Sequence, residues 1–172
     1  LPMLTLLNSN ALLPLCELLG RLESRRLRMI IVDALEGLGK QHGEILASKL
    51  SDARWYLVRN MVLVLGRIGD PTIVDRFRPL VHHPRAQVRK EVVRAIQQMN
   101  HPNATDLQLS FLKDPDGGIR MAAVRALGQA RYQPARELLL QIIQSRECRG
   151  KNLAEKASLF DALGRIGGEV VI

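Results

Sequence analysis

Aromatic side chains are scarce in this chain of 172 residues, at 3% of the composition, although 47% of the residues are hydrophobic. The core must therefore be built from Leu, Ile, Val and Ala. No apolar run reaches the roughly 18 residues that a membrane-spanning helix needs, which predicts no contact with a membrane. The opening residues also have neither the basic start nor the small-residue cleavage site of a signal peptide.

Cysteine is nearly as rare, because Cys16 and Cys148 are the only two and stand near opposite ends. In an array whose neighbouring helices lie ~10 Å apart, they would be several layers from each other. A disulfide needs Cα atoms within about 7 Å, so we expect two reduced thiols and a cytoplasmic location. We predict that Cys16 is buried in the apolar core. Cys148 stands between Arg146 and Arg149 with no histidine base nearby. We therefore predict no catalysis by this thiol, and reversible oxidation is the one reaction left open.

Basic charge is abundant but unevenly placed, with a net charge of +8. Residues 1–75 carry nine Lys/Arg against eight Asp/Glu, and residues 137–172 carry five against five. Residues 76–136 carry eleven against four. Such a surplus serves solubility, or it meets an acidic or phosphorylated partner at the middle of the molecule.

An apolar helical segment recurs five times along the chain. Its closing residues stand at 35, 65, 96, 127 and 163, which gives steps of 30, 31, 31 and 36. Within a copy the apolar positions fall at i, i+4, i+7 and i+8, as at Ile119, Ala123, Ala126 and Leu127, which is one buried helix face. The surplus of five in the last step falls in the polar stretch 145–151, which we predict to be a loop. The period indicates one helical module every 31 residues or so.

Each recurring helix is preceded by a shorter one, at residues 73–81, 104–112 and 135–143, and by a turn such as the one at residues 114–118. Prolines open the shorter helix or its approach at Pro71, Pro102 and Pro134. Left-handed caps are predicted to end the longer helices at these residues: Gly37/Gly39, Gly66/Gly69, Asn100, Gly128 and Gly164/Gly167. Each module is therefore a helix A, a turn and a helix B, and stacked modules share a core.

The stretch from Lys113 to Gly128, with its Asp-Pro turn, Ile-Arg pair and closing Ala-Leu-Gly, resembles HEAT repeats of the phycobilin-lyase-like class. The resemblance implies an all-α, right-handed α-solenoid of about five helix pairs in a single domain of a bacterial protein. We place the repeats at residues 11–39, 43–69, 71–100, 103–130 and 133–168, and expect the chain to be a fragment of a longer protein.

In this family a turn aspartate, six positions before an arginine, forms a ladder with arginines of neighbouring repeats. Asp114 and Arg120 match that spacing, and Arg28 and Arg89 keep only the arginine. The family also lines its concave face with the exposed positions of the B helices. Here that implies a groove for a protein partner with an acidic, phosphorylated or helical segment, formed by Arg59, Leu63, Lys90, Arg94, Met121 and Arg125.

Trp55 could join that groove as a recognition anchor, but we favour it as a filler of the seam between repeats. Nucleic acid binding suits the basic groove less well, since Trp55 is a lone aromatic there and we expect no acid in the central groove for base-excision chemistry. The four histidines form no His-Glu pair, so we expect no metal and no cofactor. A tetrapyrrole-handling role rests on fold analogy alone. The sequence thus predicts a non-catalytic scaffold module, monomeric by itself.

Overall fold

The structure, a computed structural model, describes residues 9–167 and divides the chain into two compact units, residues 1–99 and 100–172. Within residues 9–167 every regular element is a helix, as the sequence predicts. That the whole chain forms a single domain stays a prediction. Each unit is described by itself below.

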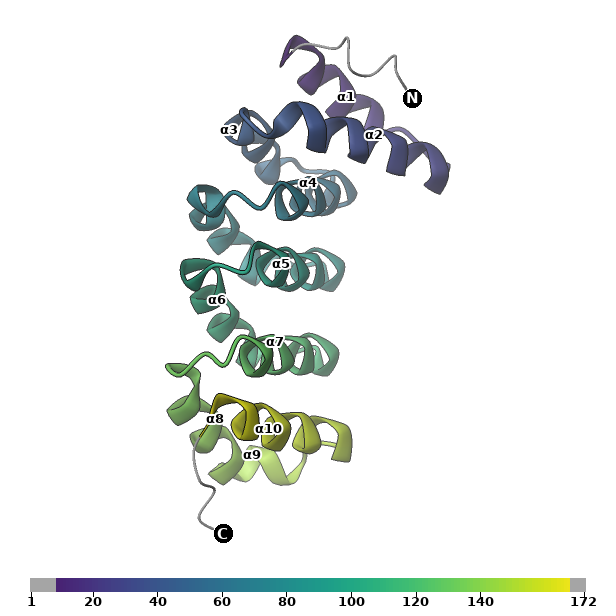
Figure 1. The fold of residues 1–172 in the computed structure, drawn as a ribbon. Coiled ribbons are helices and arrows are strands. Elements are labelled where there is room, and N and C mark those ends of the chain that lie inside the picture. The colour runs from purple at the N-terminus through teal and green to yellow at the C-terminus, as the bar shows by residue number, and fades with distance from the viewer. Residues whose placement is uncertain (1–8, 168–172) are drawn as a thin grey trace. The chain divides into compact units, whose positions relative to one another are not determined.

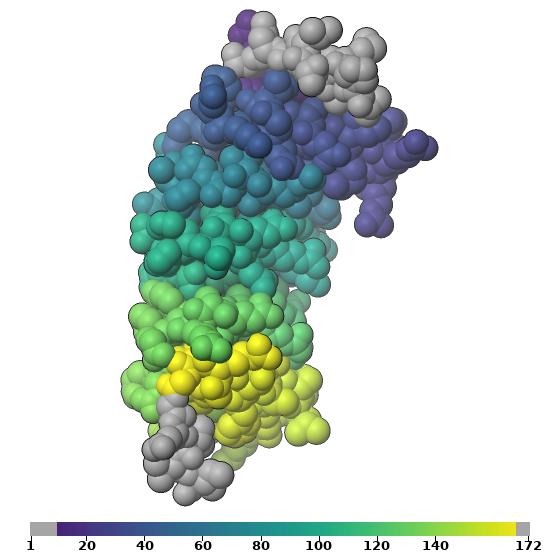
Figure 2. Space-filling model, viewed as in Figure 1, coloured from purple at the N-terminus to yellow at the C-terminus, as the bar shows by residue number. Residues whose placement is uncertain are grey.

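Unit 1 stacks three helix pairs, drawn from purple to teal in Figure 1 and seen as successive layers in Figure 2. In each pair the second, longer helix is the B helix. The B helices α2, α4 and α5 follow one another in space, with α4 packed on both α2 and α5. The elements are η2 (Ser9–Ala11), α1 (Leu12–Leu19), α2 (Arg25–Gly39), α3 (Gly43–Ala47), η3 (Ser48–Ser51), α4 (Trp55–Ile68), η4 (Pro71–His82) and α5 (Ala86–Met99).

Unit 2 contains two further pairs, whose B helices α7 and α10 pack against each other. The elements are α6 (Pro102–Leu107), η5 (Gln108–Lys113), α7 (Gly117–Gln129), α8 (Ala135–Gln144), α9 (Arg146–Arg149) and α10 (Leu153–Ile166). The predicted loop at 145–151 is wrong in part, because Ser145 accepts a hydrogen bond from the Cys148 amide and starts the short helix α9. A serine acceptor at a helix N-cap stabilises one turn even in a polar stretch.

The predicted apolar faces of the B helices are confirmed as the core. Ile119, Ala123, Ala126 and Leu127 are all buried on α7, and the equivalent Val88, Val92, Ala95 and Ile96 are buried on α5. The A helices are less regular than predicted, since η4 is a 3₁₀-helix that contains Pro79, and α6 continues as the 3₁₀-helix η5. Proline has no N–H to donate, which favours the tighter and shorter turns.

The turn between helices A and B has the same construction in three consecutive repeats. A side-chain acceptor binds the amide two residues on: Asp52 Oδ1 to Arg54 N at 2.8 Å, His83 Nδ1 to Arg85 N at 3.1 Å and Asp114 Oδ1 to Asp116 N at 2.8 Å. His83 therefore replaces the aspartate by using a ring nitrogen as acceptor. This is the Asx-turn geometry, which satisfies one backbone donor where the chain reverses.

The arginine six positions later binds the backbone of that turn. Arg120 Nη1 donates to the Asp114 carbonyl at 2.8 Å, Arg89 Nη1 to the His83 carbonyl at 2.8 Å, and Arg28 Nη1 to the Leu22 carbonyl at 3.4 Å. Because the acceptor is a main-chain oxygen, the bond survives where Leu or His stands in place of aspartate. The predicted ladder arginines thus act first as clamps on their own turns.

Two of the predicted glycine caps have a different role. Gly66 lies inside α4 and Gly128 inside α7, and neither has a left-handed backbone. A Cβ on Gly66 would stand 2.5 Å from Ala95 Cβ, and one on Gly128 would stand 2.7 Å from Ala162 Cα. These glycines let neighbouring B helices approach closely. Among the described residues, φ is positive at the predicted caps Gly69, Asn100 and Gly167, and also at Arg131. The predicted caps Gly37, Gly39 and Gly164 are wrong, because they lie within α2 and α10 without positive φ.

Candidate partner-binding surface

Three basic side chains gather where α4 and α5 pack together. Arg59 projects from α4, and Lys90 and Arg94 stand one turn apart on α5, so those two share a helix face. Arg59 is half-buried, whereas Lys90 and Arg94 are exposed. We call these three residues the basic triplet.

Glu91 lies beneath the basic triplet with its side chain 11% exposed. Its Oε2 is 3.9 Å from Arg59 Nε and 3.9 Å from Arg94 Nη1. Both distances are longer than a hydrogen bond, and the buried Arg59 Nε has no hydrogen-bond partner in the part of the chain that the structure describes. Two guanidinium groups therefore share one carboxylate loosely. We expected no acidic side chain in the central groove. This is wrong, because Glu91, the residue after Lys90, faces the contact between α5 and α4.

The α2 side of α4 is electrically balanced instead. Leu63, one turn beyond Arg59, is half-buried. A further turn along, Arg67 binds Asp33 Oδ1 through Nη1 at 2.9 Å and Glu36 Oε2 through Nε at 2.7 Å. Both acids belong to α2. The uncompensated positive charge of this face thus begins at Arg59 and continues onto α5.

In unit 2 the predicted groove residues Met121 and Arg125 both lie on α7. Met121 is half-buried and Arg125 is exposed. Arg125 Nε makes one long hydrogen bond, of 3.4 Å, to Ser158 Oγ on α10. The guanidinium is therefore only weakly held by its own unit.

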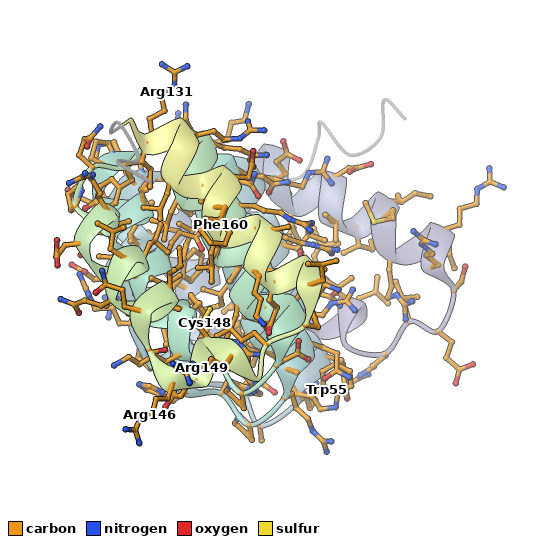
Figure 3. The ribbon with its side chains drawn as sticks, turned by 90° about the horizontal axis from the view of Figure 1, so that it is seen from below. Trp55, Arg131, Arg146, Cys148, Arg149 and Phe160 are labelled. Atoms are coloured by element: carbon orange, nitrogen blue, oxygen red, sulfur yellow. The ribbon has the colours of Figure 1, made fainter. Side chains whose placement is uncertain are left out.

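Trp55 stands at the first position of α4 and is half-buried. The Arg85 guanidinium carbon lies 6.0 Å above the ring centre, and the exposed Tyr56 makes an edge-to-face contact at 6.1 Å. A cation at that distance from a tryptophan face is attracted by the ring quadrupole. Part of the ring, labelled in Figure 3, thus stays accessible beside a cation. Arg85 escaped the sequence reasoning, although it stands 31 residues after Arg54 at the same repeat position.

An ion cluster lies at the start of α4, where Arg54 binds Asp52 at 2.8 Å and Glu17 at 2.9 Å. Lys49 reaches the same Glu17 at 3.3 Å. The hydrogen bond from Arg54 lowers the pKa of Asp52 to about 2, and Arg54 followed by Lys49 lowers the pKa of Glu17. Every charge in this cluster has an opposite partner, which makes it a structural feature of unit 1 rather than a binding site.

Two overlapping matches to the model of HEAT repeats cover residues 43–107 and 74–158, together about two thirds of the chain. This chain belongs to the HEAT-repeat family. No curated protein matches it. HEAT repeats are commonly protein-interaction scaffolds and are generally non-enzymatic. The finer resemblance to phycobilin-lyase-like repeats and the bacterial origin stay predictions.

The cysteines of this HEAT-repeat protein are both free and buried. Burial raises the pKa of Cys16 to about 11, against a smaller opposing effect of Lys49. Cys148 is only 7% exposed and lies in the helix α9, so its placement in a polar loop is wrong, while its reversible oxidation stays untested. The short helix α9 turns Cys148 inward while Arg146 points away from the helices (Figure 3).

Within residues 9–167, no three His, Cys, Asp or Glu side chains stand close enough to hold a metal ion. His83 and His101 instead accept hydrogen bonds from nearby amides, at 3.1 and 3.3 Å. Over the same residues no helix has the length and apolar character that crossing a membrane requires.

Proposed function

We propose that this HEAT-repeat protein is a non-catalytic binding module that holds an acidic, phosphorylated or helical segment of another protein against its B helices. The primary contacts would be the basic triplet and Leu63 in unit 1. Trp55 would serve as an aromatic anchor at the start of α4. In unit 2, Met121 and Arg125 on α7 are proposed as partner contacts of that unit by itself. Bacterial origin and a cytoplasmic location belong to the same proposal.

The observation that carries the proposal is the loose sharing of Glu91. The guanidinium groups of Arg59 and Arg94 share this one carboxylate, and neither comes closer to it than 3.9 Å. The buried Arg59 Nε lacks an acceptor within the described residues, and an unmet donor of this kind costs roughly 1–3 kcal/mol. The Arg59 side chain is 40% exposed as a whole, so a carboxylate or phosphate oxygen from a partner would bind its outer guanidinium nitrogens and neutralise the surplus charge.

The chemistry of the surface fits an acidic segment with apolar residues in between. Guanidinium groups bind planar carboxylates and phosphates through two parallel hydrogen bonds, which sets the register of a partner. Leu63 offers apolar contact area one turn from Arg59. A partner helix that alternates acidic and aliphatic residues would satisfy both kinds of contact.

A fluorescein-labelled helical peptide of Glu, Leu and Ala tests the proposal by anisotropy at physiological salt. We expect Arg94→Glu with Lys90→Glu to weaken binding at least tenfold, since each reversal replaces attraction by repulsion. Arg136→Glu is the control, because Arg136 is exposed on the A helix α8 and belongs to none of the proposed contacts. Far-UV circular dichroism confirms that each variant folds.

Equal binding by the double variant and the wild type would refute the proposal. An oligonucleotide and a tetrapyrrole are titrated beside the peptide to separate the other classes. Affinity for the oligonucleotide that exceeds affinity for the peptide, with the steep salt dependence of counterion release, would replace a protein partner by nucleic acid.

A further inference from the structure

A cavity of about 540 Å³ opens in unit 2 between η5, α8 and α9. Its volume falls in the range of small-molecule sites, about 300–1,000 Å³. Leu112, Leu138 and Ile142 give it an apolar side, and Lys113, Arg120 and Lys151 give it a cationic side. The carboxylates of Asp114 and Glu147 also line it.

The polar insertion builds one wall of this cavity. Residues 145–151 are the stretch that lengthens the last repeat, and they contribute Ser145, Glu147 and Lys151 to the lining. The other repeats have no such stretch between their A and B helices. The cavity is therefore a feature of this one repeat.

The neighbouring helix α8 is unusually poorly covered. Of its ten residues only Ala135 and Leu139 are buried. Four large aliphatic side chains are only half-buried, and they are Leu138, Leu140, Ile142 and Ile143. Helix α8 packs on α10 and α9, and the cavity lies on its side toward η5. Apolar area thus stays available for a ligand to cover.

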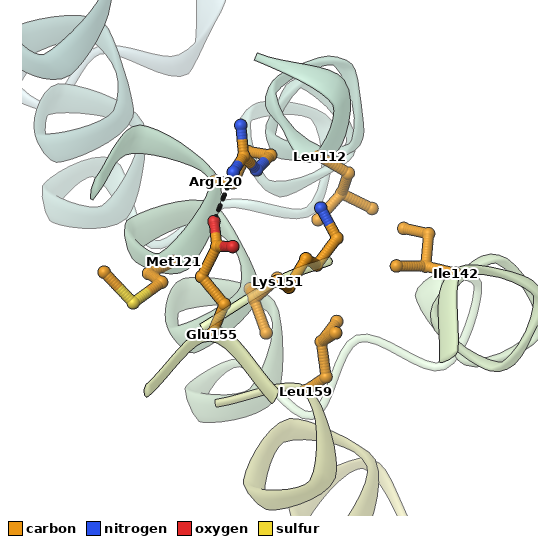
Figure 4. Close-up of a pocket in the computed structure, with 8 residues that line it drawn as sticks. Leu112, Arg120, Met121, Ile142, Lys151, Glu155 and Leu159 are labelled. Carbon is orange, nitrogen blue, oxygen red and sulfur yellow. Dashed lines mark hydrogen bonds and ion pairs between the residues drawn. The ribbon is translucent and has the colours of Figure 1, made fainter. Parts of the chain in front are cut away.

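A small apolar recess extends the cavity inward, with a volume of about 20 Å³. It shares Leu112, Arg120, Ile142 and Lys151 with the larger cavity. Met121, Val124, Leu159 and the ion-paired Glu155 complete its lining. Figure 4 shows the aliphatic side chains around it, with the Lys151 side chain crossing between Leu159 and Leu112. The recess is about the size of one water molecule or one methyl group.

The charges at the mouth favour an anion. Arg120 is paired with Glu155, with Nη2 to Oε1 at 2.5 Å, but its Nε has no hydrogen-bond partner among residues 9–167. Asp114 accepts hydrogen bonds in its own turn. Over the described chain no ion pair joins a carboxylate to Lys113 or Lys151. The lining therefore carries three cationic side chains against the two carboxylates of Asp114 and Glu147.

We propose that this cavity is a binding site for a small aliphatic carboxylate, with the carboxylate between Lys113 and Lys151, the chain along Leu138 and Ile142, and the terminal methyl in the recess. All residues of the site belong to unit 2, whereas the basic triplet belongs to unit 1, and the site needs no protein partner. It would make the module responsive to a metabolite-sized ligand.

Octanoate is the probe, titrated into the whole chain and followed by ¹H–¹⁵N NMR. We expect saturable shifts confined to the cavity lining, weak or absent shifts with acetate, which lacks the chain, and none with octyltrimethylammonium, which reverses the charge. Lys151→Gln should weaken octanoate binding about two- to fivefold, the range of a partly exposed ion pair. Glu147→Gln should strengthen it about twofold, because a repelling charge is removed.

Lys90→Gln is the matched control, because it removes a lysine of unit 1 and should leave octanoate binding unchanged. The same variant tests the basic triplet, so failure of one proposal is separable from failure of the other. Binding of octyltrimethylammonium as tight as that of octanoate would overturn the carboxylate site. So would unchanged affinity in Lys151→Gln with a wild-type helical spectrum.

Discussion

The replacement of Gly66 by alanine tests the packing of α4 on α5 most directly. The new methyl carbon would stand 2.5 Å from Ala95 Cβ and 2.7 Å from Ala95 Cα. Carbon atoms pack at about 3.5–4.0 Å, so the two helices must separate by roughly 1 Å. Because one contact is with backbone, no rotamer change relieves it.

The magnitude follows from two opposing effects. Overpacking a close interface costs about 1–3 kcal/mol, while alanine is favoured over glycine in a helix by about 0.8–1.0 kcal/mol. We expect Gly66→Ala to lower the free energy of unfolding by about 1 kcal/mol. For a chain of this size that is about 2–4 °C in Tm.

Gly37→Ala provides the matched comparison. Gly37 lies within α2, is exposed, and has no atom within 4 Å of where a Cβ would stand. The same substitution should therefore raise the free energy of unfolding by about 0.5–1 kcal/mol. The difference between the two variants isolates the cost of helix contact.

Urea unfolding followed by far-UV circular dichroism measures both variants against the wild type. We expect Gly66→Ala to lower the free energy of unfolding and Gly37→Ala to raise it, although both add one methyl group. Stabilisation by both substitutions would refute the close approach as the reason for glycine at position 66. The basic triplet spans α4 and α5, so Gly66→Ala should also weaken binding of the acidic peptide.

Two further predictions concern charges. The pKa of Asp52, about 2 instead of 3.8, is depressed, so its stabilisation is present above pH ~4 and is lost as the pH falls toward 2. Asp52→Asn should cost about 1 kcal/mol at pH 7 after allowance for solvent screening, and in urea unfolding the difference from wild type should shrink to a small fraction of that as the pH falls to 2. Arg120→Met strands the carboxylate of Glu155, which is 6% exposed, and should cost about 3–5 kcal/mol. Adding Glu155→Leu should restore much of this in the same assay, and a double variant no more stable than the single one would contradict the argument.

The basic triplet shows how far local patterns reach. Arg59, Lys90 and Arg94 were chosen from the resemblance, which implies that such B-helix positions line the concave face, and their role in binding stays a prediction. Glu91 could not be chosen in this way, because its role depends on the rotation of α5 against α4. A shift of one position around α5 decides whether the Glu91 carboxylate faces water or the contact with α4. Arg85 could not be predicted either, because its contact with the Trp55 ring forms between the starts of two different helices, α4 and α5.

The sequence by itself determined the 31-residue module, the B helices and their buried faces, because a helix repeats its side-chain directions every few residues and local periodicity reports this. It also determined the turn chemistry at Asp52 and Asp114, which involves amides only two residues away. The tertiary structure alone decided that Gly66 and Gly128 serve helix contact, that Cys148 turns inward, and that the insertion leaves a cavity. These features arise between side chains some thirty residues apart, where the distance of closest approach, and no local pattern, sets the outcome.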